Sequence, residues 1–147
     1  MERDVTTLNI PLCPVAGTPG KRVSETTLRA LLRPERQADV ALTRYRFCAT
    51  PGCDVVYFAE DGSHLFTRSD LLVRVGIKEA EAPRPVCYCF GYSVEDMIDE
   101  IRMTGRTTVP DRIRTRLESE GCHCETANPQ GSCCLGTVLA IAEELEP

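Results

Sequence analysis

The sequence predicts an α+β protein in two parts, a small β-rich module over residues 1–80 and a small helical module over residues 81–147. Two observations predict this order. Short runs rich in β-branched and aromatic residues gather in the first half, and longer stripes with helical spacing fill the second. Between them lies KEAEAPRPV, residues 78–86, whose two prolines and weak periodicity indicate a linker or an extended crossing.

The first half is expected to contain one helix followed by strands. Ser24 has the side chain of an N-cap, and leucines follow it at helical spacing until Pro34 ends the pattern. Three strand-like runs come next, over residues 43–48, 54–60 and 64–68. The turn sequence EDG between the last two runs predicts a hairpin.

The second half is expected to contain three helices. Ser93 opens an apolar stripe that ends at Gly105. Pro110 stands where a first helical turn tolerates proline, and this helix stops at Gly121. The third helix covers residues 136–146, with its apolar side chains on one face. The simplest interpretation of these stripes is an ordinary helical core.

The composition favours bound metal. The chain of 147 residues has nine cysteines and no tryptophan, so it is short of large core-forming side chains and rich in soft ligands. The N-terminal sequence MERDVTTLNIPLCP lacks the apolar run of a secretory signal, and a cytoplasmic location is expected. In that reducing compartment, closely spaced cysteines more often bind metal than form lasting disulfides.

The charge pattern excludes several classes of function. The net charge is −5, and the basic residues form no block that would bind nucleic acid or an anionic membrane. No run of eighteen apolar residues occurs, so membrane insertion is not expected. The sequence also shows no hydrolase or transferase signature: it has no Ser-His-Asp arrangement, no phosphate-binding glycine loop and no nucleotide fingerprint.

The second half carries a dense group of thiols, which we call the second cysteine group. It consists of Cys87, Cys89, Cys122, Cys124, Cys133 and Cys134. A Cys-x-Cys pair cannot form an unstrained disulfide with itself, so the first two members need other partners. Four thiolates from two loops can hold an iron–sulfur cluster, and four thiolates also suit zinc, which stays as the alternative.

The stretches CYCFGYSVEDMIDEI and CHCETANPQGSCCLG resemble the 2Fe-2S domain of the bacterioferritin-associated-ferredoxin type, in the variant found in CopZ copper chaperones. The resemblance implies that Cys87, Cys89, Cys124 and Cys134 bind a 2Fe-2S cluster. Cys122 and Cys133 are the alternates for the last two positions. Ligation by His123, as in a Rieske centre, would leave too many thiols unused.

The first half contains Cys13, Cys48 and Cys53, the first cysteine group. In YRFCATPGCDVVYF, a proline and a glycine between Cys48 and Cys53 indicate a tight loop that directs both sulfurs at one ion. Cys13 lies in a similar turn and makes the third zinc ligand. The fourth position is open to His64, which is the chemically reasonable candidate, to Asp54 or to water.

This half, through LLVRVGIKE, resembles the zinc-binding part of the CopZ N-terminal region, so the expected fold becomes a small zinc-stabilised β-rich module followed by a small helical 2Fe-2S-binding module. One difference is clear. Where the family can present Cys-Pro-x-Cys, this chain has Ala16 in the last position. The resemblance also leads us to expect a stand-alone form without the heavy-metal-associated domain.

Taken together, the motifs predict a redox and metallochaperone-like protein in which one-electron transfer is linked to the handling of copper or another soft metal ion. Reduction of copper ions is the one enzymatic activity that this hypothesis would include. A protein partner for electron or metal transfer is expected. The alternatives are a simple ferredoxin-like electron carrier with structural zinc and a metal-responsive sensor.

Overall fold

The computed structural model describes residues 11–121 and 123–146. Its first half contains β1 (Lys21–Val23), α2 (Glu25–Leu31), β2 (Tyr45–Phe47), β3 (Val55–Ala59), β4 (Leu65–Thr67) and the 3₁₀ helices η1 (Pro34–Asp39), η2 (Arg68–Asp70) and η3 (Gly76–Lys78). Its second half contains β5 (Pro85–Cys87), β6 (Tyr92–Ser93), α3 (Val94–Thr104), α4 (Val109–Glu120), α5 (Cys124–Ala127) and α6 (Leu135–Leu145). The predicted α+β class is confirmed. Among the described residues, no helix has the length and apolar character needed to cross a membrane.

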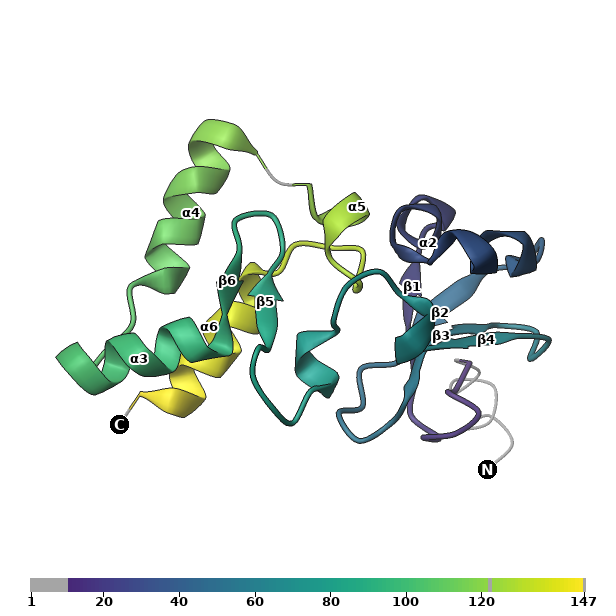
Figure 1. Cartoon of the computed structure of the whole chain (residues 1–147), viewed down its shortest axis with the longest axis horizontal. Helices are drawn as coiled ribbons and strands as arrows, with labels where there is room; N and C mark the ends of the chain where they lie inside the picture. Colours follow the sequence, from purple (N-terminus) through teal and green to yellow (C-terminus); the bar gives the residue numbers. More distant parts are fainter. Residues whose placement is uncertain (1–10, 122, 147) are drawn as a thin grey trace, which may run out of the picture.

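The first half is built on an antiparallel sheet in the order β1-β2-β3-β4, with α2 beside it (Figure 1). The predicted helix is confirmed, and its cap works as expected because the Ser24 hydroxyl accepts a hydrogen bond from the Thr27 amide at 3.3 Å. The predicted β3–β4 hairpin is also present. Leu28 of α2 packs into a core with Phe47, Tyr57 and other buried side chains of the sheet.

The second half contains α3, α4 and α6 and the two-stranded β5–β6 hairpin (Figure 1). All three predicted helices are present, and α6 begins at Leu135, one residue before the expected start. Met97, Ile113 and Val138 bring the three apolar stripes into one buried cluster. The short elements β5, β6 and α5 have no counterpart in the sequence-based expectations.

The stretch 78–86, expected to be a linker or an extended crossing, is built into the fold at both of its ends. Lys78 ends η3 and is only 5% exposed, and Val86 is buried within β5. The buried apolar side chains nevertheless fall into separate clusters for the two halves of the chain. Val75 is the last buried member in the first half, and Val86 is the first in the second half. The division at residue 80 stays a prediction.

The loop between α5 and α6 contacts the first half directly. The Tyr57 hydroxyl on β3 donates a hydrogen bond to the Pro129 carbonyl at 2.6 Å. The Thr27 hydroxyl on α2 donates to the Glu125 carbonyl at 2.7 Å. Both contacts fix the backbone that lies between Cys124 and Cys134, so the first half helps to shape a loop of the second cysteine group.

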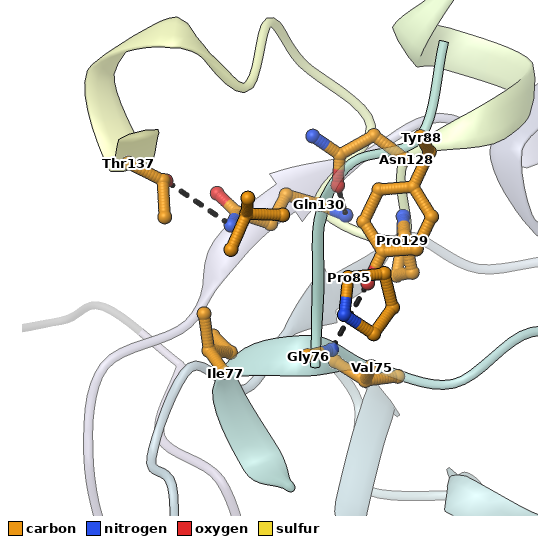
Figure 2. A pocket seen from close by; sticks show the side chains of 10 residues that line it. Val75, Gly76, Ile77, Pro85, Tyr88, Asn128, Pro129, Gln130 and Thr137 are labelled. Atoms are coloured by element: carbon orange, nitrogen blue, oxygen red, sulfur yellow. Dashed lines mark hydrogen bonds between the residues drawn. The ribbon is translucent and has the colours of Figure 1, made fainter. Parts of the chain in front are cut away.

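A small pocket marks the same junction, and Figure 2 shows η3, Pro85, Tyr88 and the loop around Pro129 converging on it. The Tyr88 hydroxyl donates to the Arg74 carbonyl at 2.8 Å and accepts from the Gly76 amide at 3.0 Å. Gly76 lies so close to β5 that an added Cβ would be 1.7 Å from the Pro85 carbonyl oxygen. Only glycine permits this approach.

Replacement of Tyr57 by phenylalanine tests the contact with the loop. We expect Tyr57→Phe to lower the free energy of unfolding by about 1–3 kcal/mol in urea titrations, because it leaves the buried Pro129 carbonyl without its donor. Amide exchange at Gln130 and Gly131 is expected to accelerate. Tyr45→Phe is the matched control, since the Tyr45 hydroxyl accepts from the Ala41 amide within the first half. Unchanged exchange in Tyr57→Phe would contradict the contact.

Candidate metal centres

The three members of the first cysteine group come together at one end of the sheet. Cys48 directly follows β2, Cys53 lies just before β3, and Cys13 comes from the turn that precedes β1. Backbone hydrogen bonds hold each loop, from the Cys53 amide to the Thr50 carbonyl at 3.2 Å and from the Cys13 amide to the Thr18 carbonyl at 2.8 Å. The three sulfur atoms all lie within 4.8 Å of one another, and all three residues are buried.

The electrostatics of the group favour an ionised sulfur at Cys48. Burial raises the pKa of this thiol, but hydrogen bonding at Thr50 and Cys13 and the positive charge of Lys78 lower it, and the net pKa is below the ordinary value. At Cys53, burial raises the pKa. The Ala16 amide donates to the Cys13 sulfur at 3.4 Å, so Ala16 contributes a backbone donor where the family can place a cysteine. Three convergent thiols fit a zinc site with one further position.

The structure does not bring His64 to this group. His64 precedes β4, where its carbonyl accepts from the Ala59 amide at the far end of β3 from Cys53, and its ring packs edge-on against Phe66 at 4.8 Å between centroids. The Asp54 carboxylate is directed to Arg68, with an Nε–Oδ1 distance of 2.9 Å. Neither residue belongs to the group of ligand atoms formed by the three cysteines. Water is left among the expected fourth ligands.

Four members of the second cysteine group also gather, and we call them the four-thiol set: Cys87, Cys89, Cys124 and Cys134. Cys87 ends β5, Cys124 begins α5, and Cys134 immediately precedes α6. The Cys89 and Cys124 sulfurs are 3.5 Å apart. Hydrogen bonding to Cys134 lowers the pKa of Cys87 to about 6, and the same hydrogen bond raises the pKa of Cys134.

The arrangement of the four-thiol set differs from that of the first group. Its sulfurs contact one another as two pairs, Cys89 with Cys124 and Cys87 with Cys134. Within the described part of the chain, only the first cysteine group has at least three ligand atoms that all lie within 4.8 Å of one another. Two pairs suit two metal ions better than one tetrahedral ion. Backbone donors complete the environment, because the His123 amide donates to the Cys89 sulfur at 3.0 Å. The set therefore fits a 2Fe-2S cluster.

Of the remaining candidates, Cys133 and His123 are described by the structure and do not belong to the four-thiol set. Cys133 is exposed, although its neighbour Cys134 is buried. Cys122 falls outside the described residues. His123 is exposed and acts through its backbone amide. Sequence reasoning missed Lys78, whose ammonium nitrogen lies 3.7 Å from the Cys48 sulfur, because a lysine in a charge-rich stretch carries no sign of burial.

Comparison with known proteins gives three similarities. Residues 10–72 match the zf_CopZ family, described as a zinc binding domain. The copper chaperone CopZ of Archaeoglobus fulgidus is 32% identical over 122 residues, which make up 83% of this chain and 57% of that protein. The X-ray structure of the A. fulgidus CopZ N-terminal domain is similar with a TM-score of 0.75 and 29% identity, over 88% of this chain and 96% of that domain.

These similarities support a zinc binding domain of the CopZ type at residues 10–72, a range that includes the whole first cysteine group. Over most of its length, the chain is similar in fold to the N-terminal domain of A. fulgidus CopZ. The chain spans 57% of the length of the curated relative that it matches. The expectation of a zinc site in the first half is thereby supported.

Proposed function

We propose that this chain handles copper or another soft metal ion and couples that task to one-electron transfer. In this proposal the first cysteine group binds zinc, and the four-thiol set binds a 2Fe-2S cluster. The observation that carries the proposal is the gathering of four thiols from three separate segments into two contacting pairs. The similarity to CopZ over 88% of the chain supports it.

The environment of the four-thiol set suits a redox centre that exchanges electrons with partners. Three of the four cysteines are buried, whereas Cys89 is partly exposed and gives the site an edge toward solvent. A 2Fe-2S cluster bound there supplies one-electron transfer. The amide donors at the sulfurs stabilise negative charge, and such donors raise a reduction potential.

The chain also carries a thiol beside this site that the proposed cluster does not need. Cys133 is exposed next to Cys134, so its sulfur is accessible to a soft ion in solution. We assign to it transient binding of copper as a substrate. Zinc at the first cysteine group has a structural role in this scheme, with water as its fourth ligand.

Anaerobic purification with metal analysis tests the proposal. We expect about two irons, about two sulfides and about one zinc per chain, and an electron paramagnetic resonance signal of a 2Fe-2S centre after reduction by dithionite. Copper(II) added to the reduced protein, after removal of excess dithionite, should yield one copper(I) per electron lost. Iron-free protein after reconstitution would refute the cluster.

A second candidate, a plain electron carrier, is favoured by the partly exposed Cys89 alone. The copper experiment separates the two functions. If the reduced protein keeps its spectrum in copper(II) but transfers electrons to a protein acceptor, the chain is an electron carrier. A Cys133→Ser variant gives the second comparison, because only the copper-handling function requires this thiol.

A further inference from the structure

Lys78 is the most unusual charged residue in the described part of the chain. Its side chain is only 5% exposed, and lysine is among the residues that are almost never buried without a partner. It is the last residue of η3. The burial of a full positive charge requires a physical explanation.

Every donor of the Lys78 ammonium group has an acceptor in the first cysteine group or its loop. The nitrogen donates to the Thr50 carbonyl at 2.8 Å, to the Cys53 carbonyl at 3.0 Å and to the Cys48 sulfur at 3.7 Å. An ammonium group has three N–H bonds, so these contacts use all of them. The side chain is therefore held in one position, directed at the metal-binding loop.

The hydrogen bonds leave the charge itself without a carboxylate partner. Lys78 forms no ion pair within 4.0 Å with a carboxylate of any described residue. The adjacent acid, Glu79, pairs with Arg74 at 2.9 Å and with Arg68 at 3.6 Å. Two of the acceptors of Lys78 are neutral carbonyls, so the cysteine sulfurs are the groups within reach that can carry the opposite charge.

We propose that Lys78 is the counter-charge of the zinc site and positions its Cys48 ligand. Three thiolates and a divalent ion carry one net negative charge, and the buried ammonium group cancels it. A buried site without net charge avoids the desolvation cost of an uncompensated buried charge. The inference rests on zinc binding by the first cysteine group, which is part of the proposed function.

The proposal also specifies the class of the fourth zinc ligand. With Lys78 in place, an uncharged ligand such as water keeps the whole unit neutral, whereas a carboxylate would restore a buried negative charge. This agrees with the engagement of Asp54 by Arg68. The site is thus suited to a divalent ion with three thiolates and one neutral ligand.

Zinc affinity of three variants of the full chain tests the inference. We expect Lys78→Met to weaken zinc binding by about 10–100-fold in competition with a chromophoric chelator, the range typical for residues that support metal ligands. Lys78→Arg, which keeps the charge, should recover most of the affinity. Lys21→Met is the matched control: it removes the only other lysine, which is exposed, and should change the affinity less than about threefold.

Lys78→Gln separates charge from hydrogen bonding. Glutamine can still donate to a loop carbonyl, so it also serves if Lys78→Met does not fold, as judged by circular dichroism. We expect Lys78→Gln to bind zinc as weakly as Lys78→Met. Affinity equal to that of the unmodified chain in either neutral variant would overturn the proposal. Failure of the proposed zinc site itself is distinguishable, because the unmodified chain would then bind no zinc.

Discussion

A Cys87→Ala variant is expected to lose nearly all of the 2Fe-2S cluster that we propose for the four-thiol set. Cys87 is fully buried at the end of β5, and its sulfur forms a pair with that of Cys134. Removal of one ligand leaves only three thiols in the four-thiol set, and a 2Fe-2S cluster needs four. Iron and sulfide analysis after anaerobic reconstitution, together with the visible spectrum, measures the effect. Alanine is preferred to serine because it offers no oxygen ligand.

The exposed Cys133 provides the matched control for this variant. Cys133→Ala changes the same atoms one residue from Cys134, yet it should keep full iron and sulfide content because its thiol lies outside the four-thiol set. Cys134→Ala should behave like Cys87→Ala. If Cys133→Ala instead loses the cluster while Cys134→Ala retains it, the two neighbours exchange roles and our assignment is wrong.

The helices could be predicted from the sequence because their start and stop signals are local. Ser93 accepts a hydrogen bond from the Asp96 amide, and the Asp96 side chain in turn accepts from the Ser93 amide, so a four-residue pattern fixes the start of α3. Gly105 ends the same helix in a left-handed conformation. The hairpin strands β5 and β6 have only three and two residues, too few for a recognisable alternation. The four-residue α5 contacts the distant α2 through the Thr27–Glu125 hydrogen bond, which no local pattern encodes.

The same distinction holds for the candidate sites. Cysteines are rare and chemically distinctive, so their spacing alone divided them into two groups, whereas the choice of Cys124 and Cys134 as cluster ligands came from the family resemblance. The residues that support them were not recognisable. Lys78 is thirty positions from Cys48, and Tyr57 is seventy-two positions from Pro129. For His64 the error was to propose a residue that is not near the site. His64 was proposed as a ligand because it follows the Cys48–Cys53 loop closely in the sequence, but β3 separates the two and places His64 at the other end of the sheet.

Removal of zinc is expected to destabilise the first half strongly. Cys13, Cys48 and Cys53 are buried together with Val55 and other apolar side chains, and a zinc ion bound by the three sulfurs would link their loops. At free zinc a thousand times the dissociation constant, binding stabilises the fold by about 4 kcal/mol. For a chain of this size the loss corresponds to a decrease of about 10 °C in the melting temperature. Circular dichroism melts before and after chelation measure it.

Zinc removal should also affect the four-thiol set, because β3 connects it to the first cysteine group. Cys53 leads into β3, and Tyr57 on that strand holds the Pro129 carbonyl in the loop between Cys124 and Cys134. Loosening of the strand therefore frees the loop, and we expect the cluster to decay faster under air in zinc-depleted protein. Readdition of zinc should reverse the effect. Identical decay with and without zinc, in protein whose zinc content has been measured, would show that the two sites act independently.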